Sequence, residues 1–159
     1  IPSVREAIDI PLIAAGGIGS GKAMLAAMIL GADGVQVGSR FLASHESSAH
    51  IDFKNRVLQA EEGETKLTLK ELTPVRLLDN AFSREIKAIY ERKGTTEALA
   101  SHLGRGRAKK GMFEGDLVNG ELEVGQVSSM IKEIKPASDI VKELMEEYHR
   151  ALTAKTLLL

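Results

Sequence analysis

The stretch IPLIAAGGIGSGKAMLAAMILGADGVQVGSRF, Ile10 to Phe41, decides the fold of this chain because it alternates apolar runs with glycine turns. The run PLIAA ends in two glycines, as expected of a parallel strand that is buried on both faces. The segment SGKAMLAAMILG has the apolar spacing of a helix, with Ser20 as its N-cap and Gly31 directly after its end. A second strand over 35–37 then ends in a turn at Gly38. The stretch therefore predicts a strand, a helix and a strand of an α/β fold.

Two phosphate-sized turns are expected side by side at the carboxyl edge of this sheet. Parallel strands joined by a helix bring both glycine turns to that same edge. At Gly17 no Cβ obstructs the backbone N–H groups, and the following helix adds its positive end, so an anion is favoured there. The second turn adds the N–H groups of Gly38 and Ser39 and the Ser39 hydroxyl. Arg40 could neutralise the phosphate or pair with a carboxylate, and for the first turn alone a tight turn without a ligand stays an alternative.

The run GGIGSGK, Gly16 to Lys22, also matches the G-x-x-x-x-G-K core of an ATP-binding P-loop. Position 23 is alanine, however, where that motif needs a hydroxyl to hold Mg²⁺, and no second acidic Mg²⁺ motif follows an apolar strand. A non-catalytic phosphate- or nucleotide-binding module is therefore the more distant alternative. We expect Lys22 to be solvated on the first turn of the helix.

The composition narrows the class of protein. The chain has 159 residues, 43% of them hydrophobic, a formal net charge of −1 and no cysteine. These values are typical of a globular domain and exclude disulfides and thiolate metal sites, and we expect no metal ligands. The net charge of −1 does not suggest a nucleic acid as partner. No run of about 18 apolar residues is present that could span a bilayer, so we expect a cytoplasmic protein without a membrane partner. The chain begins without Met or a signal peptide, so we expect it to be cut from a longer protein.

Beyond residue 44 the pattern predicts mostly helices. Asn119-Gly120 stands between apolar residues and predicts a tight hairpin. The expected helices cover 3–9 (final turns only), 47–63, 83–94, 96–103 and 138–152. In the helix over 47–63, Phe53 and Val57 share one face, and in the next one Phe82, Ile86, Ile89 and Tyr90 stand at helical spacing. The helix over 138–152 has an apolar stripe of Ile140, Val141, Leu144, Met145 and Tyr148, and a short strand is expected over 65–72, where Leu67 and Leu69 alternate with polar residues. The final residues, 153–159, are expected to fray.

The stretch from Ile10 to Ser47 resembles the last two strand-helix units of the nitronate monooxygenase family, formerly called 2-nitropropane dioxygenases. This family also includes the flavin-dependent enoyl-acyl-carrier-protein reductase II. The segment GMFEGDLVNGELEVGQVSSMI, Gly111 to Ile131, is similar to the C-terminal part of the same family, including its Gly-Gln pair at Gly125 and Gln126. The pairing AAGGI…GADGVQVGSRF carries most of this resemblance, which spans nearly the whole chain.

The resemblance implies the C-terminal part of a (β/α)₈ TIM barrel that carries FMN. Residues 1–44 would be the last two β/α units with the flavin-phosphate turns, and residues 45–159 a mostly helical segment with a small hairpin. A complete barrel needs about 250 residues. The cofactor-binding residues implied are Gly17, Gln36, Val37, Gly38 and Ser39. Many relatives have Gly-Thr where this chain has Gly38-Ser39, and serine keeps both the N–H and the hydroxyl.

The implied reaction is oxidation of an alkyl nitronate by O₂ to a carbonyl compound and nitrite. The alternative is reduction of an enoyl thioester by NAD(P)H through the same flavin. Relatives place the catalytic histidine and the isoalloxazine contacts upstream of the segment that corresponds to Ile1, so we expect no catalytic residue here and an inactive fragment. The expected partners are the small-molecule substrate, the missing N-terminal half of the barrel and, as a candidate, a second copy of the chain.

Two further groups of residues could suggest chemistry. His45 and His50 follow the second turn, but they do not match the family's catalytic motif, and surface or capping roles are expected. His102 and His149 are expected to be structural residues of helices. The basic run GRGRAKKG, over 104–111, could bind an anionic partner such as a cofactor phosphate or an acyl carrier protein. Without interleaved aromatic residues it is a poor nucleic-acid signal, and a solvated loop is the simpler interpretation.

Overall fold

The structure is a computed structural model of the chain and describes residues 1–156. It divides into two compact units, which we call unit 1 (residues 1–46 with the segment from Ile134 onward) and unit 2 (residues 47–133). The elements of unit 1 are α1 (Pro2–Ala7), β1 (Ile13–Ala15), α2 (Gly21–Ile29), β2 (Gly34–Gln36), α3 (Ser39–Leu42) and α7 (Ala137–Thr156). Those of unit 2 are α4 (Ile51–Leu58), β3 (Lys66–Thr68), β4 (Val75–Leu77), α5 (Ala81–Glu91), α6 (Thr96–Leu103), a π-helix (Lys109–Phe113) and a 3-10 helix (Gln126–Met130).

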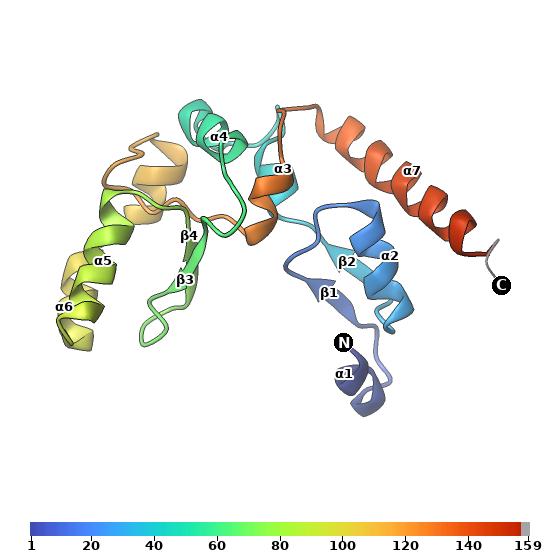
Figure 1. Cartoon of the computed structure of the whole chain (residues 1–159), viewed down its shortest axis with the longest axis horizontal. Helices are drawn as coiled ribbons and strands as arrows, with labels where there is room; N and C mark the ends of the chain where they lie inside the picture. The colour runs from blue at the N-terminus through green and yellow to red at the C-terminus, as the bar shows by residue number, and fades with distance from the viewer. Residues whose placement is uncertain (157–159) are drawn as a thin grey trace. The chain divides into compact units, whose positions relative to one another are not determined.

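Unit 1 contains the predicted strand, helix and strand. β1 and β2 pair in parallel, with Ile13 opposite Gly34 and Ala15 opposite Gln36, and α2 connects them (Figure 1). Ser20 caps α2, since its Oγ accepts a hydrogen bond of 3.2 Å from the N–H of Ala23. The α/β pattern and the parallel pairing are therefore confirmed.

The predicted burial of β1 on both faces is wrong. Ala14 is buried, whereas the Ile13 side chain is 54% exposed. Side chains alternate between the faces of a strand, so only one face of β1 is buried. On that face, Ala14 packs in a small apolar cluster with Ile18, Ala27 and Ala32. Among the described residues the sheet of unit 1 has two strands, and the face that carries Ile13 is only partly covered.

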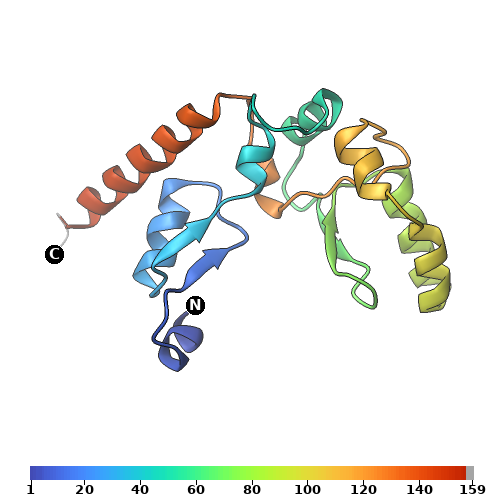
Figure 2. The same cartoon turned by 180° about the vertical axis from the view of Figure 1, so that it is seen from behind.

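The last helix, α7, packs along α2 in unit 1 (Figure 2). The two backbones approach so closely that a Cβ atom at Gly21 would lie less than 3.0 Å from the Leu144 carbonyl oxygen and the Tyr148 amide nitrogen. The chain therefore returns from unit 2 to unit 1 and packs its last helix against α2. The division between residues 44 and 45 stays a prediction of domain organisation.

The predicted helix over 138–152 is confirmed, and α7 extends beyond it at both ends. Its apolar stripe is only partly covered, because Ile140 is buried while Val141 and Met145 are exposed. Residues 153–156 are part of α7 and not a frayed tail, and 157–159 lie outside the described residues. Within the described part of the chain, no helix is both long and apolar enough to cross a membrane.

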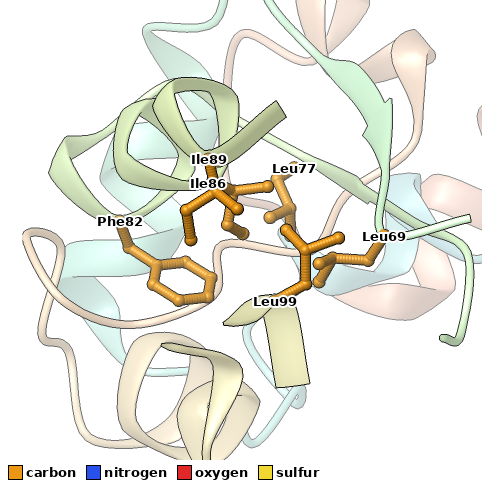
Figure 3. Packing of buried hydrophobic residues seen from close by; sticks show 6 residues of the cluster. All are labelled: Leu69, Leu77, Phe82, Ile86, Ile89 and Leu99. Carbon is orange, nitrogen blue, oxygen red and sulfur yellow. The ribbon is translucent and has the colours of Figure 1, made fainter. Parts of the chain in front are cut away.

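Unit 2 contains a buried apolar cluster around α5, shown in Figure 3. The predicted apolar face of α5 supplies Phe82, Ile86 and Ile89, and Tyr90 lies at its margin, 36% exposed. The remaining members are Leu69, Leu77 and Leu99. Asn80 and Ser83 form a reciprocal capping box at the start of α5. This helix therefore begins two residues earlier than predicted and ends at Glu91, before Gly94.

Two other expectations for unit 2 need correction. The helix α4 buries Phe53 and Val57 as predicted, but it ends at Leu58 and not at Gly63. After it, the chain turns, because the Glu64 carboxylate accepts a hydrogen bond from the N–H of Glu61 and pairs with Arg56. In β3, Leu67 is 47% exposed while Leu69 is buried outside the strand with a φ of 53°. A shared face for these two leucines is therefore wrong.

The predicted hairpin at Asn119-Gly120 does not form. The turn exists, held by Asp116, whose carboxylate accepts hydrogen bonds from the N–H groups of Val118 and Asn119. The residues after the turn, however, pair with β4, since the N–H of Val124 donates to the carbonyl of Arg76 and Glu123 lies opposite Leu77. Unit 2 has its hairpin elsewhere, in the antiparallel pair β3 and β4. The residues before the turn form the π-helix instead of a strand.

Two carboxyls near this turn predict a pH-dependent stability. Burial raises the pKa of Glu121 above its usual 4.5, the nearby Glu123 charge raises it further and Arg107 opposes both. Burial also raises the pKa of Glu123. Between the unfolded and folded pKa values, the folded state holds more protons than the unfolded state. Stability should therefore fall as the pH rises from 4.5 through the raised folded values.

Replacing Glu121→Gln should remove part of this fall, because the side chain then stays neutral. Urea unfolding of the full-length protein at a series of pH values measures the effect, and Glu62→Gln, at an exposed position, serves as the control. We expect a flatter stability profile for Glu121→Gln alone. Parallel profiles for wild type and both variants would contradict the prediction.

Candidate functional site

The two glycine turns begin at a pair of hydrogen-bonded strands. Ala15, the last residue of β1, is the register partner of Gln36, the last residue of β2. Because the strands are parallel, the chain leaves both of them at the same edge of the sheet. The five predicted cofactor-binding residues therefore lie on the two segments at this edge. Gly17 is in the first turn, Gln36 is at the end of β2, Val37 and Gly38 follow, and Ser39 is the first residue of α3.

The backbone at these turns leaves room for a ligand. Gly16 and Gly17 have φ values of 87° and 73°, which only glycine adopts readily. A Cβ atom at Gly16 or at Gly38 would meet no atom within 4 Å. Within residues 1–156, the N–H groups of Gly17 and Gly38 make no hydrogen bond. Both turns thus present an unpaired N–H group, and each has open space at one glycine, Gly16 or Gly38, which is an arrangement that suits a phosphate group.

Arg40 pairs with a carboxylate. Its guanidinium Nη2 lies 3.7 Å from Oε2 of Glu143 on α7, and its side chain is 12% exposed. Lys135 also forms an ion pair with Glu143. Of the two sequence-based interpretations of Arg40, the carboxylate partner is confirmed. In the described structure the positive charge that follows the second turn is therefore directed to α7.

The start of α2 is occupied by the protein's own groups. The N–H of Gly21 donates a hydrogen bond of 2.8 Å to Oε2 of Glu147, and the N–H of Ala23 donates to Ser20. The expectation that this helix end helps to bind an external anion needs correction, because a carboxylate on α7 already uses it. Nothing in the sequence indicated Glu147, which lies 126 positions from Gly21.

Removing this carboxylate should loosen the first turn of α2. For Glu147→Ala we expect a loss of about 1 kcal/mol of stability, the usual cost of deleting a helix cap. Hydrogen exchange at residues 21–24 of the full-length protein should accelerate accordingly. The neighbouring Glu146→Ala, which removes only a 4.0 Å pair with Lys142, is the matched control. Equal exchange rates in the two variants would contradict the capping role.

The remaining features of the first turn agree with the rejection of a P-loop. Lys22 is exposed, as predicted. Ala23 offers no hydroxyl, and its N–H is already bonded to Ser20. The described structure therefore lacks the Mg²⁺-holding hydroxyl that an ATP-binding loop needs at this position.

Two of the four histidines, His50 and His102, have structural roles. Nδ1 of His50 accepts a hydrogen bond of 3.2 Å from the N–H of Asp52 and caps α4, so the expected capping role is confirmed. The ring of His102 stacks on Phe82 with ring centroids 5.1 Å apart. His45 and His149 are exposed.

The basic run over 104–111 is largely used inside unit 2. The Arg107 guanidinium lies 4.9 Å from the centre of the Phe82 ring and donates to the carbonyls of His102, Leu103 and Asn119. Lys109 and Lys110 pair with Glu114 and Asp116. Three of the four cations in the run thus have partners within unit 2. The structure therefore favours neither a site for an anionic partner nor a freely solvated loop.

Comparison with known proteins identifies the family. The family model described as nitronate monooxygenase matches residues 1–147. The chain belongs to the nitronate monooxygenase family. A probable nitronate monooxygenase of Bacillus subtilis is 50% identical over 68 residues, or 43% of this chain and 20% of that protein. One from Staphylococcus saprophyticus is 30% identical over 155 residues, covering 94% of this chain and 43% of that protein.

Solved structures of two similar proteins have the same fold as this chain over nearly its whole length. The structure of FabK from Thermotoga maritima is 34% identical with a TM-score of 0.90, covering 99% of this chain and 50% of that one. A nitroalkane oxidase from Streptomyces ansochromogenes is 36% identical with a TM-score of 0.77, covering 96% of this chain and 43% of that one. The chain thus spans about half the length of these relatives or less. It matches part of an α/β fold, and closure of a barrel is not seen in residues 1–156.

Proposed function

We propose that this chain is the flavin-phosphate-binding part of an FMN-dependent nitronate monooxygenase, which oxidises alkyl nitronates with O₂ to a carbonyl compound and nitrite. One observation carries the proposal. Two glycine turns leave neighbouring parallel strands at one edge, with unpaired amides at Gly17 and Gly38 and with open space beside Gly16 and Gly38. The family membership supports the reaction class, and the similarity to a nitroalkane oxidase supports the nitro-compound substrate.

The proposed contacts to the phosphate come from the backbone. The N–H groups of Gly17, Gly38 and Ser39 would donate to the phosphate oxygens, and the Ser39 hydroxyl would add a further donor. Gln36 and Val37 would contact the cofactor from the end of β2. A phosphate held by backbone amides needs no side-chain cation, which agrees with the use of Arg40 by Glu143.

The flavin, when bound, would supply the two-electron oxidation. This chain's own residues would fix the phosphate end of the cofactor and thereby its orientation. We propose that the base and the substrate pocket come from the rest of the protein, because none of the four histidines lies in the glycine turns and two of them have structural partners. The partly covered face of β1, where Ile13 is exposed, supports further strands packing there in the whole protein.

Reduction of an enoyl thioester by NAD(P)H is the second candidate. The two glycine turns would serve either reaction, and the chain shares its fold with an enoyl reductase domain of MlnA from Bacillus amyloliquefaciens, with a TM-score of 0.75 over 97% of this chain. At 17% identity this similarity concerns the fold alone. This similarity does not favour the reductase reaction, and the experiment below therefore tests both reactions.

The test uses the full-length protein loaded with FMN. A nitronate monooxygenase should consume O₂ and release nitrite with propyl-2-nitronate, and it should leave NAD(P)H unchanged in the presence of crotonyl thioester. The opposite pattern would replace the proposal by the reductase. A protein that binds ATP with Mg²⁺ and ignores FMN would overturn both and support a nucleotide-binding module.

A further inference from the structure

Unit 2 contains a cleft that the flavin proposal does not use. Its volume is about 410 Å³, and it is formed by the β3–β4 hairpin, the loop between these strands and the exposed side of α5. Sites for small ligands usually have volumes of about 300–1,000 Å³. None of the five residues proposed to hold FMN lines this cleft.

The apolar part of the cleft is formed by three side chains. Leu77 is buried and also belongs to the apolar cluster around α5 (Figure 3). Leu67 and Tyr90 line the cleft with partly exposed side chains. The cleft therefore offers a hydrocarbon chain or ring a surface from which it would displace water.

The charged side chains around the cleft carry an excess of positive charge. Lys66, Lys70, Arg84 and Lys87 are the cations that line it, and Glu71 and Asp79 are the carboxylates.

Both carboxylates are already engaged. Oδ2 of Asp79 accepts a hydrogen bond of 3.0 Å from Nε of Arg84, and Oε2 of Glu71 accepts one of 2.6 Å from the Tyr90 hydroxyl. Among residues 1–156, the Lys66 side chain has no ion pair or hydrogen bond. Lys70 acts through its charge on the neighbouring Glu71, whose pKa is lowered by the hydrogen bond from Tyr90 and further by Lys70. One cation without a partner and one beside an exposed carboxylate thus lie at the margin of an apolar cleft.

We propose that this cleft binds a small anionic amphiphile, a molecule with an apolar portion and one phosphate or carboxylate group. The apolar portion would lie against Leu67, Leu77 and Tyr90, and the anion would pair with Lys66 and Lys70. A cation would be repelled by the surplus positive charge, and an uncharged apolar molecule would gain no attraction from the two ammonium groups.

Calorimetric titration of octyl phosphate into the full-length, FMN-loaded protein tests this proposal. Octyl phosphate should bind at least about ten-fold more tightly than octanol or inorganic phosphate, because each of these lacks one of the two recognised parts. Octanoate in a parallel titration shows whether carboxylate replaces phosphate, and binding of either amphiphile supports the site.

Charge-reversal variants inside and outside the cleft show whether octyl phosphate binds in this cleft. Lys66→Glu/Lys70→Glu should weaken octyl phosphate binding by about ten-fold or more, since two attractive charges become repulsive. The matched control is Arg92→Glu/Lys93→Glu, which makes the same charge change in unit 2 outside the cleft and should change binding less than about two-fold. Leu67→Ser should also weaken binding. Circular dichroism spectra identical to wild type show that each variant is folded.

Two results would overturn the proposal: no binding of either amphiphile to the wild type, or equal weakening by the cleft variant and its control. Neither result bears on the flavin site, because flavin content is read separately from the absorbance of the same samples.

Discussion

A Gly38→Val variant of the full-length protein should purify with little or no bound FMN. The Gly38 N–H is one of the proposed phosphate donors, and a branched side chain would fill the open space into which the phosphate must come. With the phosphate kept away, the hydrogen bonds from the N–H groups of residues 38 and 39 to its oxygens would be lost. At about 1.5–3 kcal/mol each, this loss predicts an affinity for FMN that is weaker by at least about 100-fold. The flavin absorbance per protein in the purified variant measures the effect.

The backbone at position 38 should accept valine without a loss of stability, so a loss of flavin can be assigned to the binding site. Gly38 has a φ of −105° and a ψ of −68°, values that valine can adopt, and no neighbour would clash with its Cβ. The variant should therefore unfold at the same temperature as the flavin-free wild type.

Lys22→Ala is the matched control, because Lys22 is exposed and would matter only in a P-loop. It should keep its full flavin content. Stoichiometric FMN in Gly38→Val, or loss of flavin in Lys22→Ala, would contradict the assignment of the phosphate turns.

A Gly120→Ala variant should destabilise unit 2 by about 3 kcal/mol or more, at the upper end of what overpacking costs. A Cβ at Gly120 would lie less than 3.0 Å from the Cα and the nitrogen of Gly111 and from the carbonyl oxygen of Asp116. These are backbone atoms, which cannot rotate away as a side-chain end can. Hydrogen exchange of residues 107–124 in the full-length protein should show the loss of protection.

Gly63→Ala separates this clash from ordinary backbone strain. Gly63 has a φ of 76°, and a Cβ there would meet no atom within 4 Å. Its expected cost is only that of the left-handed conformation, about 1–2 kcal/mol. If Gly120→Ala were no more destabilising than Gly63→Ala, close packing at the Gly111–Gly120 contact would not be the reason for glycine at position 120.

The elements that could be predicted from the sequence are those with local causes. Ser20 and Gly31 bound α2 as expected, since capping depends on residues within one turn of the helix end. The parallel strand pair and the amphipathic face of α5 follow from the periodicity of apolar residues. The positions of the two glycine turns at the ends of these strands follow from Gly17 and Gly38.

The errors concern contacts between residues far apart in the chain. Asn119-Gly120 has the local composition of a hairpin turn, but residues 122–124 find a better partner in β4, which precedes them by more than 40 positions. The apolar composition of β1 predicts burial on both faces, whereas burial depends on what packs against each face. A pattern of residue types does not contain that information.

By itself, the sequence determined the α/β character of residues 10–41, the ends of α2 and the two glycine turns, because backbone geometry and helix capping depend on neighbours along the chain. Only the tertiary structure decided that α7 packs against Gly21, that Glu147 occupies the start of α2, that Arg40 pairs with Glu143, and that four cations surround the cleft of unit 2. The reason is physical: these contacts join residues whose approach depends on how whole helices and strands pack, and no local propensity encodes that packing.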